Sequence, residues 1–462
     1  MGWLSDDQAV ESGLSLPGEL PRSKALPSRS LRSNFAWALV GNLVYAGSQW
    51  GMLIVLAKLG SPEMVGCFAL GLAVSAPVVM FTNLQLRAVQ ATDAKGQYHF
   101  RDYLSLRLAT SAFGLCVIAG IAALGGYRSE AALVILIIGF AKGVESVSDS
   151  IHGLLQKNER LDLIAISTMI KGLLSLLAIW SLVYLTKSIV WGTIGLLAAR
   201  SLVLLSYDAG NARRVLRLTP GQDRDKDKGL LARLPALREL AWLALPLGLV
   251  SLLDSLNVNV PRYLIEQRLG EAALGYFAAM TYIMVAGNML VGALTHSASP
   301  RLARYHVADP PAFRRLLWRL LGFGAALGGA GLLLAVVLGR PLLTLIYRPD
   351  YAEHADVFVW VMAASGIGYI VRFLICGMTA SRRIKAQAPL YAGTLLVTAV
   401  SSWLLIPRYG LLGAAWALCA AMTVLLLGAA TISLAGPRVS DNHESDGLVE
   451  DDSADSYVAE RR

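Results

Sequence analysis

Charged residues are scarce in this chain. They make up 16% of the 462 residues, whereas hydrophobic residues make up 55%. This balance excludes a soluble globular protein of this length and predicts an integral membrane protein. The four cysteines all fall within hydrophobic runs: Cys67, Cys116, Cys376 and Cys419. That placement argues against a disulfide framework or a cysteine metal site, and it favours apolar packing.

Short catalytic motifs are also missing. The sequence contains no G-x-S-x-G elbow, no P-loop, no H-E-x-x-H helix and no cluster of Cys and His. We therefore expect no enzymatic activity, no cofactor and no metal site. The first 30 residues lack an apolar core segment, so they do not resemble a cleavable signal peptide.

Hydrophobic runs of about 20 residues, long enough to cross a bilayer, are abundant. Six precede the longest internal polar segment, at 36–57, 65–82, 104–125, 131–152, 162–185 and 188–206. Six follow it, at 238–260, 273–295, 317–338, 355–378, 388–405 and 411–434. The sequence thus predicts an all-α polytopic membrane protein with twelve transmembrane helices. We expect a tail at 1–34, a first lobe at 35–206, a linker at 207–237, a second lobe at 238–434 and an acidic, disordered tail at 435–462.

Lys and Arg concentrate in one set of alternate loops, including the polar segment 206–240. Because short cytoplasmic loops retain positive charge, this asymmetry predicts that both tails and the linker are cytoplasmic. The net charge of +9 then reflects loops that face an anionic leaflet, and it requires no nucleic acid as a partner.

The two halves of the chain share short matches. The stretch "LAKLGSPEMVGCFAL" aligns with "EQRLGEAALGYFAAM", which pairs Gly66 with Gly275, and "WGTIGLLAAR" aligns with "YGLLGAAWAL". Small residues are common wherever membrane helices touch, which is the simpler explanation. The matches nevertheless fall at corresponding helices of each half. We therefore predict an internal duplication, with two six-helix lobes and a substrate site between them.

The run at 131–152 contains ionisable residues. Lys142, Glu145, Asp149 and His152 follow one another at spacings of 3, 4 and 3, which places them on one helix face. Each ionised residue at the centre of a membrane helix costs about 2.5 to 3.5 kcal/mol on insertion scales. Either these residues neutralise one another, as Lys142 and Glu145 could at i, i+3, or they line a polar cavity.

Further polar residues lie within other hydrophobic runs. They are Lys171, Arg372, Asp254, Asn257, Asn259 and Arg262, and Asn259 corresponds in the repeat to Gln49. Together they predict a polar cavity that suits an anionic ligand such as a phosphate or diphosphate. Glu145, Asp149 and Asp254 are candidates for coupling to a proton or sodium ion, or else for pairing with nearby cations. We expect the aromatic residues Tyr45 and Tyr282 to be interfacial anchors or packing residues.

Three blocks resemble the bacterial polysaccharide biosynthesis membrane proteins, the O-antigen and exopolysaccharide flippases. The first block is 42–108, which begins with "NLVYAGSQWGMLIVLAKLGSPEMVGCFAL". The second is "ESVSDSIHGLLQKNERLDLIA" at 145–165, and the third is "PRYGLLGAAWAL" at 407–418. The resemblance covers residues 34–434 and implies a fold similar to the multidrug and toxin extrusion transporters and the lipid II flippase. It also implies a location in the bacterial cytoplasmic membrane.

The resemblance implies movement of a polyprenyl-diphosphate-linked oligosaccharide to the outer leaflet by alternating access. It points to Lys142, Lys171 and Arg372 as cavity cations. The first helix lacks the basic residue that related lipid flippases often have, so we expect Asn42 and Gln49 to contact sugar hydroxyls there. Implied partners are membrane lipids, a coupling proton or sodium ion, a polysaccharide polymerase and glycosyltransferases.

Two other functions predict different sequences. An ion-coupled exporter of drugs or organic cations requires an acidic, aromatic cavity, so Lys171 and Arg372 count against it unless carboxylates neutralise them. A membrane polymerase or ligase requires a large external loop, which the sequence lacks. A purely structural scaffold would not need charges buried on several helices.

Overall fold

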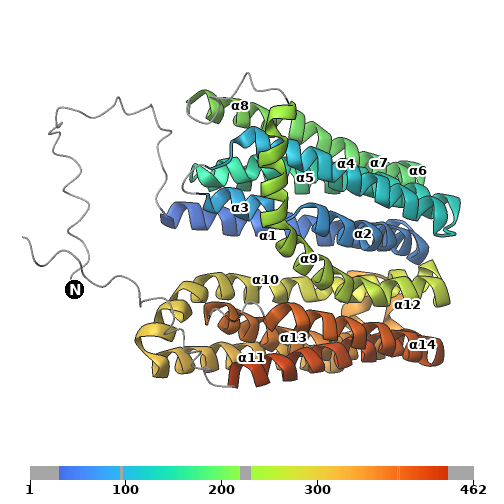
Figure 1. The fold of residues 1–462 in the computed structure, drawn as a ribbon. Helices are drawn as coiled ribbons and strands as arrows, with labels where there is room; N and C mark the ends of the chain where they lie inside the picture. The colour runs from blue at the N-terminus through green and yellow to red at the C-terminus, as the bar shows by residue number, and fades with distance from the viewer. Residues whose placement is uncertain (1–30, 94–96, 219–229, 382, 384–385, 435–462) are drawn as a thin grey trace, which may run out of the picture.

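The long apolar runs form helices, because backbone N–H and C=O groups have no water to bind inside a bilayer. The structure, a computed structural model, describes residues 31–93, 97–218, 230–381, 383 and 386–434. Within these ranges every regular element is a helix, as an all-α membrane protein requires (Figure 1). Residues 1–30 of the predicted first tail, the predicted tail at 435–462 and the centre of the predicted linker lie outside the described residues, whereas residues 31–34 of the predicted first tail belong to the first helix.

Helices of the first half run in sequence order from α1 to α8. They are α1 (Leu31–Leu59), α2 (Pro62–Thr82), α3 (Leu86–Thr92), α4 (Phe100–Leu124), α5 (Ser129–Lys157), α6 (Leu161–Thr186), α7 (Ile189–Val203), a π-helical turn (Leu204–Asp208) and α8 (Ala209–Leu218). The second half contains α9 (Leu230–Leu269), α10 (Glu271–Ala308), α11 (Pro310–Ile346), α12 (Pro349–Ala352), α13 (Ala355–Ala380) and α14 (Gln387–Leu434).

Eleven helices in the described part of the chain are long and apolar enough to cross a membrane, against the twelve that the sequence predicts. Helix α14 explains the difference. At Gly410 the backbone leaves the helical conformation, with φ 59° and ψ −134°, a region that glycine adopts at little cost. The chain reverses there, since a Cβ at Gly428 would lie 2.3 Å from Leu390 Cδ1. The predicted helices at 388–405 and 411–434 are the two arms of α14.

The helices pack as two lobes (Figure 1). In the first lobe α1 packs on α6, and α5 lies against α2, α4 and α7. In the second lobe α13 contacts α10, α11 and α14. Helix α9 links them, because its first part crosses the first lobe, where Leu240 and Ala244 pack near Tyr98 and Tyr103. Residues 230–237 of the predicted linker already belong to α9, and the predicted domain boundaries remain a prediction.

The lobes meet tightly at one end of the bundle. We call this the tight-turn end, because it contains the short turns at 60–61, 125–128, 187–188, 270 and 410. Polar contacts that cross between the lobes there include Lys58 Nζ to Leu345 O at 2.9 Å, an Arg348 guanidinium N–H to Gly60 O at 3.1 Å, and Arg128 to Glu271 at 3.5 Å. These contacts, together with the α2–α10 crossing, hold the two lobes together at this end.

Candidate functional site

Helix α5 divides its polar residues between two environments. Lys142, Glu145 and Asp149 line a cavity of about 420 Å³, together with Ala76, Val79, Met80, Asn83, Gln85, Arg87, Ala88, Ser146 and Gln156. His152 lies elsewhere, buried inside the first lobe against Ser167. The predicted single polar face is therefore two faces, of which one opens to the cavity and the other faces the interior of the lobe.

Glu145 is shared by three hydrogen-bond donors. Its carboxylate accepts from the Tyr45 hydroxyl at 2.6 Å, from Lys142 Nζ at 2.9 Å and from an Arg200 guanidinium N–H at 2.9 Å. Arg200 is buried, with 2% of its side chain exposed. The pairing of Lys142 with Glu145 is thus present, and the Tyr45 hydroxyl binds a carboxylate in place of an interfacial role. The sequence reasoning missed Arg200, although an arginine within the run 188–206 needs a partner.

Asp149 is likewise shared by two arginines. Arg87 and Arg107 each lie 3.2 Å from one of its carboxylate oxygens. Arg107 is fully buried in α4, where it also donates to Ser150 Oγ at 3.1 Å and to Asn83 O at 2.9 Å. The sequence analysis did not name either arginine as a site residue, yet Arg87 lines the cavity and Arg107 is buried behind its wall.

Lys171 lies inside the first lobe, away from the cavity. It is 4% exposed, and its ammonium group lies 2.7 Å from Asp208 Oδ2. Asp208 ends the π-helical turn and is fully buried. In this conformation Lys171 already has an anionic partner.

In the second lobe Arg372 is exposed on α13. Its side chain forms no hydrogen bond or ion pair with any residue that the structure describes. Asp254 on α9 and Tyr391 on α14 lie within electrostatic range of it. Asn257 is buried beside them and joins α9 to α14, because its amide donates to Tyr391 O at 3.1 Å and accepts from Thr398 Oγ1 at 3.1 Å.

The remaining predicted polar residues lie on α1 and α9. Asn42 is exposed on α1, and Asn259 is buried on α9, where it accepts from an Arg262 guanidinium N–H at 3.3 Å. Within the described residues, Arg262 Nε and Gln49 Nε2 are buried and lack a hydrogen-bond partner. These two donors are therefore available to a ligand or to water.

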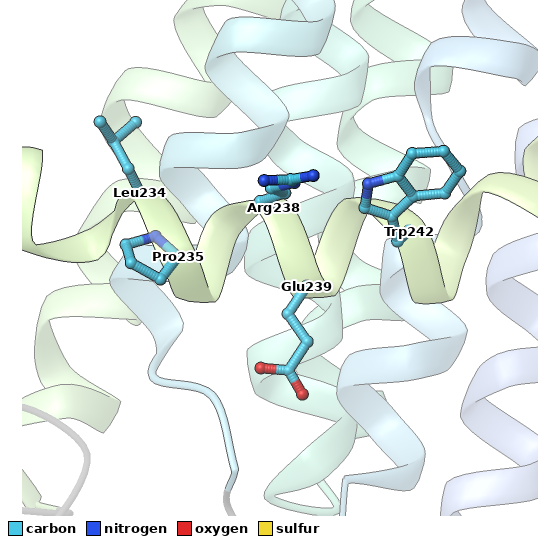
Figure 2. A pocket seen from close by; sticks show the side chains of 5 residues that line it. All are labelled: Leu234, Pro235, Arg238, Glu239 and Trp242. Carbon is cyan, nitrogen blue, oxygen red and sulfur yellow. The ribbon is translucent and has the colours of Figure 1, made fainter.

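A larger hollow, of about 640 Å³, lies along the first part of α9 (Figure 2). Its side chains come from this one helix: Leu234, Pro235, Arg238, Glu239 and Trp242. Arg238 and Trp242 point to one side of the helix and Glu239 to the other, so the polar groups do not converge on one ligand. The cavity at α5 is therefore the candidate site. No group of three or more His, Cys, Asp or Glu side chains in the described ranges is placed to hold a metal ion.

Comparisons with known proteins agree with this arrangement. The family model described as polysaccharide biosynthesis protein matches residues 31–306. The capsular polysaccharide biosynthesis protein CapF of Staphylococcus aureus is 26% identical over 397 residues, which cover 85% of this chain and 97% of that protein.

Two solved structures share the fold. The lipid II flippase MurJ in an inward closed conformation superposes with a TM-score of 0.65 at 13% identity, covering 86% of this chain and 87% of MurJ. A mutant of the MATE transporter VcmN of Vibrio cholerae gives a TM-score of 0.60 at 16% identity, covering 87% of this chain and 95% of VcmN. At such identities the likeness concerns the fold alone.

Proposed function

This chain belongs to the polysaccharide biosynthesis protein family, and from that premise we propose that it is a flippase for a polyprenyl-diphosphate-linked oligosaccharide. The cargo moves from the inner to the outer leaflet of the bacterial cytoplasmic membrane and supplies surface polysaccharide assembly. The printed role of CapF in capsular polysaccharide biosynthesis supports this substrate class. The family and the fold are those of membrane transporters, which supports transport in place of catalysis.

The observation that carries the proposal is the unpaired Arg372. It lies on α13, within a stretch apolar enough to span the membrane, where a cation without a partner is costly. Asp254 is near but makes no ion pair with it among the contacts of the described residues. A diphosphate group suits the Arg372 side chain, because a guanidinium can bind it through two parallel charge-assisted hydrogen bonds.

The cavity at α5 supports the same ligand. Each of its two carboxylates, Glu145 and Asp149, is held by two cations of the described chain. Arg87 and Lys142 line the cavity and the buried Arg107 and Arg200 lie behind it, so four cations surround these two carboxylates. That balance favours an anionic cargo and disfavours an organic cation, because like charges repel in a poorly screened site.

The other predicted contacts divide into two groups. Lys171, Asn257 and Asn259 already bind protein groups, so they contact cargo only if those bonds exchange. Gln49 and the exposed Asn42 retain donors for sugar hydroxyls. We retain all five as proposed cavity residues, with Lys142 and Arg372 as the proposed diphosphate contacts.

The contacts that close the tight-turn end support the proposal of alternating access. We propose that this end faces outward, that both chain ends lie in the cytoplasm, and that cargo enters from the opposite end. A coupling proton or sodium ion, and contacts with a polymerase or glycosyltransferases, remain predictions.

The test uses the purified protein in liposomes that contain a fluorescent polyprenyl-diphosphate oligosaccharide. Label in the inner leaflet should become accessible to an external quencher faster than in protein-free vesicles. Arg372→Ala should slow this exposure about 10- to 100-fold, the loss expected for charge-assisted hydrogen bonds worth about 1.5 to 3 kcal/mol. Arg372→Lys should recover part of the rate.

The control is Arg340→Ala, which removes an exposed cation of α11 near the tight-turn end and should leave the rate unchanged. Two results together would favour an exporter of organic cations over a flippase. The inner-leaflet label would stay inaccessible to the quencher under both proton and sodium gradients, and the protein would export a cationic dye. An equal loss of rate in Arg372→Ala and Arg340→Ala would contradict a specific role of Arg372.

A further inference from the structure

Five buried polar side chains form a cluster inside the first lobe, behind the cavity wall. Ser148 and His152 come from α5, Ser167 and Lys171 from α6, and Asp208 from the π-helical turn. None is more than 5% exposed. Ionisable groups in such a position cost energy, so they point to a function more often than isolated surface charges do.

The carboxylate of Asp208 is satisfied without His152. Lys171 Nζ lies 2.7 Å from Oδ2, the Ser167 hydroxyl donates to Oδ1 at 2.6 Å, and the Ser148 hydroxyl also donates to Oδ2. The π-helical turn that ends at Asp208 places this carboxylate between α5 and α6, and such turns often occur at functional sites. His152 is therefore an additional ionisable group beside a complete ion pair.

The hydrogen-bond directions fix the neutral tautomer of His152. A hydroxyl has one hydrogen, and that of Ser167 goes to Asp208. Ser167 Oγ must therefore accept from His152 Nε2, at 3.2 Å, so the neutral ring is protonated at Nε2. The lone pair of Nδ1 is left without a partner among the described residues.

We propose that His152 is a proton-binding site of the first lobe. A proton taken from water adds to Nδ1, and the ring becomes an imidazolium. Nε2 lies 3.8 Å from Asp208 Oδ1, too far for a hydrogen bond but close enough for an ion pair with the charged ring. The cluster then changes from a neutral Lys171–Asp208 pair to a net charge of plus one. This inference does not depend on the cargo.

Charged groups on the surrounding elements determine what this change does. Those that face the cluster are Lys171 on α6, Asp208 and Tyr207 on the π-helical turn, and Arg87 on α3. Arg87 interacts electrostatically with His152 and is one of the two arginines that bind Asp149. Protonation of His152 repels Arg87 and so weakens the hold of Arg87 on the cavity wall. The site thus connects proton binding to the cavity through α5 and α3.

The experiment is nitrogen NMR of protein labelled in its histidines, in lipid nanodiscs without cargo, from about pH 8.5 to about pH 5. His152→Gln assigns the signal by its loss, and His306→Gln, a histidine of α10 that packs on Phe313, is the matched control. At high pH the His152 signals should show hydrogen at Nε2 only, and both nitrogens should become protonated as the pH falls.

Ser167→Ala gives an independent test, because it removes the group that fixes the tautomer. In this variant the Nε2 signal of the neutral ring should shift, because the hydroxyl that accepts its hydrogen is gone. A wild-type ring that stays neutral over the whole range overturns the proposal, as does a neutral ring protonated at Nδ1. These outcomes are read without transport, so failure of the flippase assay does not affect them.

Discussion

Gly66 and Gly275 lie at the point where α2 and α10 cross with their backbones in contact. A Cβ at Gly66 would lie 1.8 Å from the carbonyl oxygen of Glu271, and a Cβ at Gly275 would lie 2.0 Å from that of Pro62. These glycines are matched positions of the predicted internal repeat. At this contact between the lobes only hydrogen fits as a side chain.

Gly275→Ala should destabilise the protein by about 1 to 3 kcal/mol, because the added methyl group forces the two backbones apart. The control is Gly292→Ala on the same helix, where a Cβ meets nothing within 4 Å. That change should be neutral or stabilise by up to about 1 kcal/mol. Thermal unfolding in detergent compares the two variants. Equal melting temperatures would mean that α2 and α10 do not make this contact in solution.

Tyr347→Phe should weaken closure of the tight-turn end. The Tyr347 hydroxyl accepts from Trp50 Nε1 at 3.1 Å and donates to Ala279 O at 2.8 Å, which links α1 to the second lobe. Loss of a buried partner costs about 1 to 3 kcal/mol.

Tyr351→Phe is the matched control for this hydroxyl. The Tyr351 ring is equally buried and stacks on the Tyr347 ring, with 5.1 Å between the ring centroids. The Tyr351 hydroxyl, however, has no partner among the described residues. Its removal should be neutral. Distances between spin labels on the two lobes should lengthen in Tyr347→Phe alone, and lengthening in both variants would contradict the assigned hydrogen bonds.

Glu145→Gln should destabilise the fold, because it leaves the buried Arg200 without a counter-charge. Removing one partner of a buried pair costs about 3 to 5 kcal/mol, and the partial exposure of Glu145 places the expected loss at the lower end. The double change with Arg200→Met should recover part of that loss. Glu130→Gln, at an exposed position of α5, is the control. Unfolding free energies that simply add in the double variant would argue against the pair.

The contacts of the Asp93 carboxylate, which lies outside the membrane spans, should be sensitive to acid. Burial raises its pKa, but the backbone N–H groups of Gln97 and Tyr98 and the charge of Lys157 outweigh burial and hold the pKa below its ordinary value. A lowered folded pKa stabilises the protein above the unfolded value of about 3.9, and this stabilisation is lost as the pH falls through the folded pKa.

The corresponding measurement compares wild type with Asp93→Asn between about pH 6 and about pH 3. The difference in unfolding free energy should be largest at the higher pH and should shrink as the pH falls. Lys157→Met, which removes one of the lowering charges, should move the wild-type decline to higher pH. A difference that stays constant with pH would mean that Asp93 does not titrate against folding.

The helices were predictable because hydropathy alone identifies a segment that spans a bilayer. The run at 131–152 corresponds to α5 at 129–157. The matched glycines Gly66 and Gly275 lie where α2 and α10 cross, a contact that the sequence analysis did not predict. The reversal at Gly410 joins the two predicted helices with no intervening loop, so they form the two arms of α14 on either side of that residue.

The site was predicted less completely, because its pairs join residues far apart in the chain. Arg107 is separated from Asp149 by 42 positions, and Arg200 from Glu145 by 55. The helical periodicity of the sequence carries no information about pairs that are so far apart in the chain. Both arginines nevertheless lie within predicted spans, where each charge requires a partner. His152 shares a helical face with Glu145 on a simple wheel, but in the structure it is buried against Ser167 of α6 and near Asp208 of the π-helical turn.

Each cavity carboxylate is paired with two cations, and this arrangement determines how an anionic ligand can bind. Glu145 has an inner partner, Arg200, and an outer partner, Lys142, while Asp149 has Arg107 inside and Arg87 outside. An incoming anion can take an outer cation while the inner one still neutralises the carboxylate. Under the proposed function, an anionic cargo would exchange with each carboxylate for its outer cation, and neither arrival nor departure would leave an unpaired charge within the membrane.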